Sequence, residues 1–187
     1  MASTADFRNG FTFQDNGELF AIIEFMHVKP GKGGAFVRTK LRNVKTKAVT
    51  ERTFRSGEKV DEVRLERRSY EFLYRDGDFY VFMNTETYDQ IQIEEGLLGD
   101  GVKFLADNLP VEILFHGDIP LEVVLPTFIE LEIIQTEPGY KGNTAQNATK
   151  PAILSTGAEI NVPLFIEAGT IVRIDTRTGD YMDRVNK

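Results

Sequence analysis

The chain has 187 residues, of which 41% are hydrophobic and 27% charged, with a net charge of −7 at pH 7, which is typical of a globular protein with one large domain or two to three small ones. It has no run of about 18 apolar residues and no basic-then-apolar start, so we expect a cytoplasmic protein without a membrane helix or secretory signal. The absence of cysteine excludes disulfides, thiolate catalysis and cysteine-bound zinc.

Charge is unevenly distributed along the chain. Residues 1–64 carry 12 Lys+Arg against 8 Asp+Glu, residues 65–126 carry 4 against 13, and residues 127–187 carry 6 against 8. Residues 29–55 hold nine basic residues and one acid, Glu51. A focused basic segment on an acidic protein indicates one specific polyanionic contact, although a solvated strand face would give the same pattern.

The first predicted hairpin covers residues 18–44. An apolar run over 18–28 predicts one strand, and the partly alternating run over 35–44 predicts another, joined by the loop "KPGKGG". In the second strand the alternation assigns Val37, Thr39, Leu41 and Asn43 to one face. It assigns the other face to Phe36, Arg38, Lys40 and Arg42.

Further hairpins and strands follow. Aromatic-rich runs around Asp76-Gly77-Asp78 predict a hairpin over 68–88, and His116-Gly117-Asp118 centres another over 111–125. Strands with glycine turns are predicted within 128–138, 152–166 and 169–183. Only 94–108 is helical in pattern, and its two internal glycines limit it to short pieces.

Many short strands indicate small barrels, and one barrel of this length would need long structureless loops. The charge blocks favour three barrels, with domains over 1–64, 65–126 and 127–187. The polar stretch 139–152 is interpreted as a loop inside the third barrel. No strong internal repeat is visible.

Residues for catalysis are scarce. Glu94-Glu95 is interpreted as a solvated pair at a helix start, and His27 and His116 lie far apart in or beside strands. "GKGG" is not a phosphate-binding loop, because that motif needs a Ser or Thr after the lysine and a helix after that. We therefore predict no enzyme, no metal and no cofactor.

The loop "KPGKGG" places Lys32 between glycines. Pro30 fixes its own φ and keeps Lys29 extended, while Gly31, Gly33 and Gly34 permit unusual φ values and leave no bulk around the lysine. Lys32 is therefore predicted to be an exposed tip. It could enter a polyanionic cleft or be presented to a modifying enzyme, or the loop could be an ordinary flexible turn.

Two long segments carry a resemblance to a known family. "HVKPGKGGAFVRTKLRN" (27–43) resembles the N-terminal domain of bacterial elongation factor P, and "KPAILSTGAEINVPLFIEAGTIVRIDTRTGDYMDR" (150–184) is similar to that family's C-terminal signature. The resemblance runs from about Asp6 to Arg184. It implies an all-β fold with a KOW/SH3-like N-terminal barrel and two OB-fold barrels, in an L-shaped, tRNA-like arrangement.

The resemblance also implies a function. Members bind the 70S ribosome between the peptidyl and exit sites, contact peptidyl-tRNA and relieve stalling at consecutive prolines. The family's tip lysine corresponds to Lys32, which in many members is extended by a lysine-modifying enzyme and reaches the CCA end of peptidyl-tRNA. Its tip-loop neighbours here are Lys29, Pro30, Gly31, Gly33 and Gly34.

Other positions follow from the basic face and from the resemblance. We expect Arg38, Lys40 and Arg42 to contact RNA phosphates. In the third domain, the loop that approaches the exit-site codon commonly reads Gly-Asp-Thr in the family and reads Gly142-Asn143-Thr144 here, so a charge is replaced by a hydrogen-bonding amide. Tyr181 and Arg184 match positions that face the small subunit.

The sequence thus favours a monomeric, non-enzymatic translation factor that stimulates peptide-bond formation. The alternative is a general OB-fold RNA-binding protein or RNA chaperone. Such proteins place aromatic stacking platforms beside basic grooves, whereas the aromatic-rich hairpin here lies in the most acidic block. An enzyme ranks third, for lack of residues. The group carried by Lys32 is not predicted.

Overall fold

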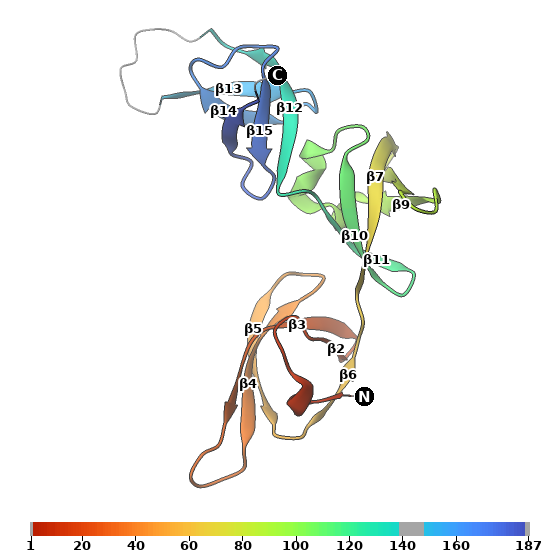
Figure 1. Ribbon diagram of the computed structural model, residues 1–187, viewed down its shortest axis with the longest axis vertical. Helices are drawn as coiled ribbons and strands as arrows, with labels where there is room; N and C mark the ends of the chain where they lie inside the picture. The colour runs from red at the N-terminus through yellow and green to blue at the C-terminus, as the bar shows by residue number, and fades with distance from the viewer. Residues whose placement is uncertain (1, 139–147, 186–187) are drawn as a thin grey trace. The chain divides into compact units, whose positions relative to one another are not determined.

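The computed structural model describes residues 2–138 and 148–185, and nearly all of its regular structure is β-strand (Figure 1). The strands form three separate sheets of six, five and five strands. The prediction of an all-β protein is confirmed.

The first sheet alternates buried and exposed residues over Phe36–Asn43, and its core is rich in phenylalanine. Phe7, Phe11, Phe13 and Phe54 are buried in one cluster, in which the rings of Phe7 and Phe54 meet edge to face with centroids 5.3 Å apart. A short 3₁₀ helix, η1 (Thr4–Asp6), follows the first strand. The strand order is β1 (Ala2–Ser3), β6 (Lys59–Glu62), β2 (Thr12–Asp15), β3 (Glu18–Val28), β4 (Phe36–Asn43) and β5 (Val49–Arg55).

The second sheet contains the two hairpins predicted around Gly77 and Gly117. Its buried aromatic residues include Phe72 and Phe82, whose ring centroids lie 5.5 Å apart. The strand order is β11 (Ile119–Val124), β10 (Pro110–His116), β7 (Glu66–Asp76), β8 (Phe79–Asn84) and β9 (Gln90–Glu94). Two 3₁₀ helices follow β9, namely η2 (Glu95–Leu97) and η3 (Gly99–Phe104).

The third sheet encloses an aliphatic core, and η3 contributes to it. Phe104 is fully buried in this core together with residues such as Ile133 and Val172, and Leu125 packs against it. At the start of β13 the Lys150 side chain is also buried, and its Nζ donates to the Glu137 carbonyl at 2.6 Å. The strand order is β14 (Glu159–Pro163), β13 (Thr149–Leu154), β12 (Phe128–Thr136), β15 (Ile171–Asp175) and β16 (Tyr181–Arg184).

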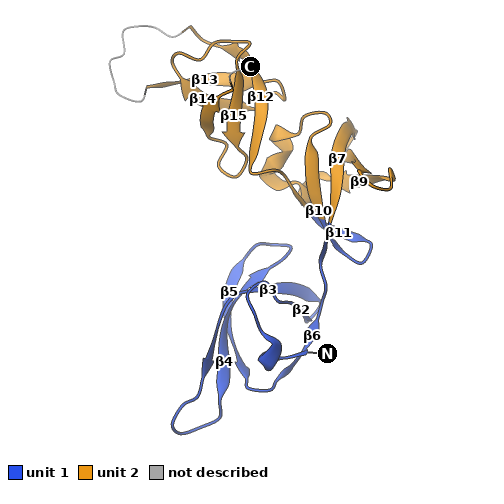
Figure 2. Ribbon diagram, in the orientation of Figure 1, with its two compact units in different colours: residues 1–67, 114–122 blue, residues 68–113, 123–187 orange. Residues whose placement is uncertain are grey.

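The chain divides into two compact units (Figure 2). One comprises residues 1–67 and 114–122, and the other comprises 68–113 and 123–187. The second sheet contributes strands to both units. The bounds of the three domains, which were predicted from the charge blocks, remain predictions. The L-shaped arrangement implied by the resemblance also remains a prediction.

The individual elements agree closely with the sequence-based expectations. The predicted first strand is β3, and β4 buries the four residues assigned to its inner face while Arg38, Lys40 and Arg42 are exposed. The helical pattern over 94–108 forms only 3₁₀ turns, as its glycines require. The short strands β1, β2, β5, β6 and β9 were not predicted individually, because two to seven residues carry little periodic signal.

A six-residue turn recurs once in each sheet, which the sequence analysis missed. It begins at a buried Asn or Asp that ends a strand, has Thr at its fourth position and has a left-handed residue at its fifth. We name it the Asx-led turn. Its three copies connect β4 to β5, β8 to β9 and β15 to β16, with the sequences "NVKTKA" (43–48), "NTETYD" (84–89) and "DTRTGD" (175–180).

The three copies share one set of hydrogen bonds. In the first copy, Asn43 Oδ1 accepts from the backbone N–H groups of Lys45 and Thr46 at 3.0 and 2.9 Å. The Asn43 backbone N–H donates to the Ala48 carbonyl, and the Asn43 carbonyl accepts from the Lys47 N–H. Thr46 Oγ1 accepts from the Ala48 N–H at 3.4 Å. Asn84 makes the same bonds in the second copy. Because the Asx side chain takes over two backbone donors, the turn is held internally.

Candidate functional site

The predicted tip lies between β3 and β4. The last paired residues are Val28 and Phe36, so residues 29–35 form a loop beyond the sheet. Lys32 is exposed, and a Cβ at Gly31 or Gly34 would have no atom within 4 Å. The structure therefore places Lys32 on an exposed loop, as the sequence predicted, with open space around Gly31 and Gly34.

Only one tip glycine adopts a conformation that disfavours other residues. Gly33 has φ +110°, whereas Gly31 and Gly34 do not lie in the left-handed region. Of the three glycines expected to permit unusual φ values, only Gly33 uses that freedom in this structure. The other two contribute only the absence of a side chain.

The hairpin that carries the tip is a regular ladder with one irregularity. The register shifts between Ile22 and Glu24, which makes Ile23 an extra residue in β3. Beyond this bulge, Glu24 lies opposite Lys40 and Met26 lies opposite Arg38. On the inner face, the rings of Phe25 and His27 meet edge to face at 5.8 Å. The stem is therefore ordered up to the loop.

The outer face of β4 carries the predicted RNA-contact residues, but it also carries acids. Glu24 Oε2 lies 4.0 Å from Lys40 Nζ, and Glu51 lies opposite Lys40 on β5. These residues, with Met26 and Arg38, line a groove of about 390 Å³. Lys40 is thus flanked by two carboxylates, one of which comes from a strand outside the basic segment. Arg38 and Arg42 are better suited to phosphate contact.

The basic segment is only partly neutralised. Within it, Lys40, Lys47 and Arg52 pair with Glu24, Glu122 and Asp15. Among the residues that the structure describes, the remaining six have no carboxylate partner: Lys29, Lys32, Arg38, Arg42, Lys45 and Arg55. The uncompensated residues of the tip and of the exposed face of β4, namely Lys29, Lys32, Arg38 and Arg42, are the arrangement expected for a polyanion contact.

The C-terminal predictions fall at the other end of the chain. Tyr181 is half-buried, and burial, together with Asp183, raises the pKa of its hydroxyl. It lines a groove of about 700 Å³ with residues that include Asn161 and Phe165. Arg184 is exposed at the end of β16. Gly142, Asn143 and Thr144 lie outside the described residues.

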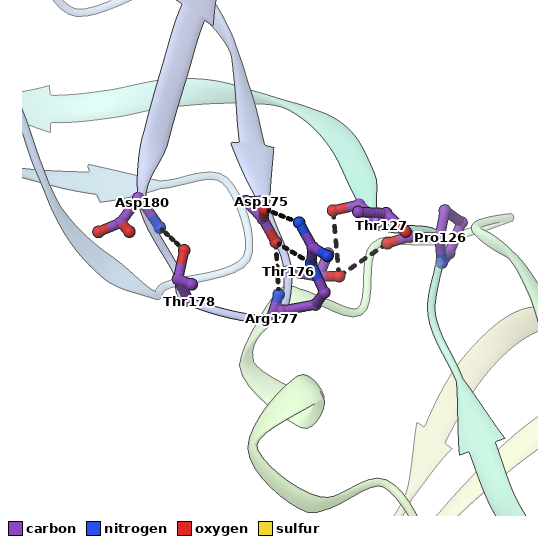
Figure 3. A network of polar contacts seen from close by, with 7 residues as sticks. All are labelled: Pro126, Thr127, Asp175, Thr176, Arg177, Thr178 and Asp180. Atoms are coloured by element: carbon purple, nitrogen blue, oxygen red, sulfur yellow. Dashed lines mark hydrogen bonds and ion pairs between the residues drawn. The ribbon is translucent and has the colours of Figure 1, made fainter. Parts of the chain in front are cut away.

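The signature "DTRTGDY" forms the third Asx-led turn (Figure 3). Arg177 donates to the Asp175 carboxylate from Nε at 3.0 Å and from its terminal nitrogen at 2.6 Å, and its backbone N–H bonds the same group. These bonds lower the pKa of Asp175 to about 2. Thr176 Oγ1 donates to the Pro126 carbonyl at 2.7 Å, so the turn is tied to the segment before β12.

Gly179, at the fifth position of this turn, lies against η3. A Cβ there would stand 3.5 Å from the Phe104 ring and 3.8 Å from Lys103 Nζ, and its φ is +79°. Thr156 Oγ1 also donates to the Lys103 carbonyl at 2.7 Å. The signature therefore has a structural use that sequence reasoning did not identify: it fixes β15 and β16 to η3 and to the segment at Pro126.

The described residues offer no cluster of three or more His, Asp or Glu side chains that could hold a metal ion. No helix among residues 2–138 and 148–185 is long and apolar enough to cross a membrane. The tip, the basic face and the C-terminal strand are the features that remain for a functional interpretation.

Family models match the segments in which all three features lie. "Elongation factor P (EF-P) KOW-like domain" matches residues 3–60, "Elongation factor P (EF-P) OB domain" matches 65–123, and "Elongation factor P, C-terminal" matches 129–184. The KOW-like assignment of the first barrel and the OB assignment of the second are thereby confirmed, and the OB assignment of the third stays a prediction.

Full-length relatives share the same description. The chain is 53% identical over 184 residues to elongation factor P of Moorella thermoacetica, covering 98% of this chain and 100% of the relative. It is 52% identical to that of Acetivibrio thermocellus, with 99% and 100% covered, and 52% identical to that of Rhodococcus jostii, with both chains covered completely.

Two solved structures share the fold at low sequence identity. Eukaryotic translation initiation factor 5A from Methanococcus jannaschii matches with a TM-score of 0.51 at 22% identity, covering 66% of this chain and 93% of that chain. A translation initiation factor eif-5a family protein from Naegleria fowleri matches with a TM-score of 0.54 at 15% identity, covering 66% and 96%. With matches to all three family domains and identity above 50% over nearly its whole length, the chain belongs to the elongation factor P family.

Proposed function

We propose that this member of a translation-factor family binds the 70S ribosome between the peptidyl and exit sites and stimulates peptide-bond formation at consecutive prolines. The observation that carries the proposal is the tip. Lys32 stands on a loop beyond an ordered two-stranded stem, and the only atom near the adjoining glycines is Pro30 Cγ, 4.0 Å from a Cβ built at Gly33. A group held out in this way can reach into a narrow site.

The chain itself is not an enzyme in this proposal. Proline is a poor substrate for peptide transfer, and the ribosome supplies the catalytic centre. The factor would hold the CCA end of peptidyl-tRNA in a reactive geometry, which lowers the barrier through orientation. Lys32, extended by a lysine-modifying enzyme, would make that contact, with Lys29, Pro30, Gly31, Gly33 and Gly34 forming the narrow loop around it.

The basic face would supply affinity. Arg38 and Arg42 are exposed and lack carboxylate partners in the described part of the chain. Both lie on the outer face of β4, one of the two strands that form the stem of the tip. They are placed to neutralise RNA phosphates, and Lys40 would contribute less because Glu24 and Glu51 flank it. Tyr181, Arg184 and the loop 142–144 would contact the small subunit and its codon region, as the family resemblance implies.

Substitution of Lys32 tests the proposal. In a reconstituted translation system, Lys32→Ala should abolish rescue of Pro-Pro-Pro synthesis while the melting temperature stays unchanged, because the side chain is exposed. Lys45→Ala is the matched control, since Lys45 is also exposed and unpaired among the described residues but lies in the β4–β5 turn. If the Lys32 variant rescues as well as the Lys45 variant, the tip is not the functional group.

A further inference from the structure

The fifth position of the Asx-led turn has an intramolecular use in two of its three copies. In the first copy, Lys47 Nζ forms an ion pair with Glu122 Oε2 at 2.5 Å. In the third copy, Gly179 lies against Phe104. The internal hydrogen bonds of the turn fix the backbone, so the fifth residue is aimed in a set direction and contacts another part of the chain.

The second copy has Tyr88 at this position, and its side chain makes no comparable contact with another part of the described chain. Tyr88 is 70% exposed, the highest value among the large hydrophobic residues that are exposed in the described chain. Within that part of the chain, its side chain has no hydrogen bond, ring contact or ion pair. An aromatic residue is thus held out in solvent by a turn that elsewhere makes a contact.

The backbone of Tyr88 is also unfavourable for its residue type. Its φ is +63°, in the left-handed region, where a bulky aromatic residue is rare and glycine is preferred. The third copy has glycine at the same position. Because Tyr88 gains no described contact in return, the strain is not offset by packing. Residues kept in such conformations cluster at sites of binding.

The neighbours of Tyr88 define the kind of partner. Glu86 and Asp89 are exposed, and neither carboxylate has an ion pair among the described residues. Two carboxylates beside an aromatic ring attract a cation and repel a phosphate, and a guanidinium or ammonium group packs favourably on a tyrosine face. The surface is suited to arginine or lysine, not to the backbone of a nucleic acid.

We propose that the turn 84–89 is a docking surface for a basic segment of a protein partner, with the Tyr88 ring receiving an Arg or Lys side chain between Glu86 and Asp89. The same turn that holds Lys47 and Gly179 against another part of the chain here presents a side chain to another molecule. This inference does not depend on the role of Lys32, and it is tested independently of the proposed function.

Titration of the full chain tests the surface directly. The probes are a nine-residue arginine peptide and a nine-residue uridine oligonucleotide, observed through the tyrosine ring resonances by NMR. We expect the peptide to shift Tyr88 more than Tyr74, which is 51% exposed in the same sheet and serves as the control. Tyr88→Ala should weaken peptide binding about threefold, the size of an exposed cation–π contact, and Tyr74→Ala should not.

Tyr88→Gly separates docking from structure. Glycine relieves the left-handed strain, so the variant should melt at the same temperature as the wild type or higher, and it should bind the peptide as weakly as Tyr88→Ala. A lower melting temperature for the glycine variant would assign Tyr88 a packing role instead. Shifts at Tyr88 with the oligonucleotide but not the peptide would assign the surface to RNA, and equal shifts at Tyr88 and Tyr74 would remove it.

Discussion

Strand β4 has a lysine-bearing loop at each end, and the two loops are built in opposite ways. At one end, residues 29–35 present Lys32 among three glycines, two of which have open space where a Cβ would stand. At the other end, Asn43 organises the turn 43–48 with its side chain, and Lys47 is fixed in a left-handed conformation with Glu122 as partner. The first loop gives its lysine reach, and the second gives its lysine a set position.

The largest effect in this comparison should come from the residue that organises the turn. Asn43→Ala leaves the backbone N–H groups of Lys45 and Thr46 without their acceptor, which should lower the free energy of unfolding by about 2 kcal/mol. Gly34→Ala at the other end should change it little, because a Cβ there meets no atom within 4 Å. Chemical denaturation measures both. Equal losses would mean that the tip loop is as structured as the turn.

The face between the two loops should respond next. Replacing Arg38 and Arg42 with Gln should reduce ribosome affinity about tenfold at moderate salt and lower the slope of log affinity against log salt by about 1.5, as expected for two lost phosphate contacts. Lys40→Gln should change the slope much less, because Glu24 and Glu51 already flank that charge. A single-residue effect at Lys40 as large as that at either arginine would contradict this reading of the face.

Backbone strain sharpens the contrast on a smaller scale. Gly33→Ala places a side chain at φ +110° and should cost about 1 kcal/mol, even though its Cβ would meet only Pro30 Cγ, at 4.0 Å. Lys47→Gly should change stability by less than about 0.5 kcal/mol, since relief of its left-handed conformation offsets loss of a partly exposed ion pair. A marked loss with Lys47→Gly would show that the Glu122 pair dominates.

The smallest expected effect is a change in stability at acid pH, and it concerns the third Asx-led turn, 175–180. The pKa of Asp175 is lowered from 3.8 to about 2 by its bonds to Arg177. A carboxyl whose pKa is lower in the folded chain stabilises the fold above its unfolded pKa and loses that contribution as pH falls through the folded value. The stability difference between wild type and Asp175→Asn should therefore be constant above about pH 4 and shrink toward pH 2. A difference that persists unchanged to pH 2 would mean that the ion pair is not its source.

The two loops also mark where sequence reasoning succeeds. The exposed tip and the alternation of β4 were predictable, because proline, glycine and a period of two act locally. The acids beside Lys40 were not, since Glu24 reaches that face through a bulge at Ile23 and a cross-strand register that no local pattern encodes. The Asx-led turns escaped for a different reason. Their common features are an Asx residue and a Thr at fixed spacing, and the hydrogen bonds that give the spacing meaning are visible only in the structure.

The distance to which the tip extends can change only in large increments. Beyond the bulge in β3, successive residues of each strand of the stem point to opposite faces. Inserting one residue into each strand, between the sheet and these positions, would therefore turn Met26 and Arg38 to the inner face. An insertion that preserves the faces must add two residues to each strand, which lengthens the hairpin by about 7 Å. The strands therefore cannot change the reach of the tip by less than this increment. Under the proposed function, smaller changes in reach come from the Lys32 side chain and from a group added to it by a modifying enzyme. A difference of a few ångströms between relatives would then lie in the chemistry of that group and not in the length of the strands.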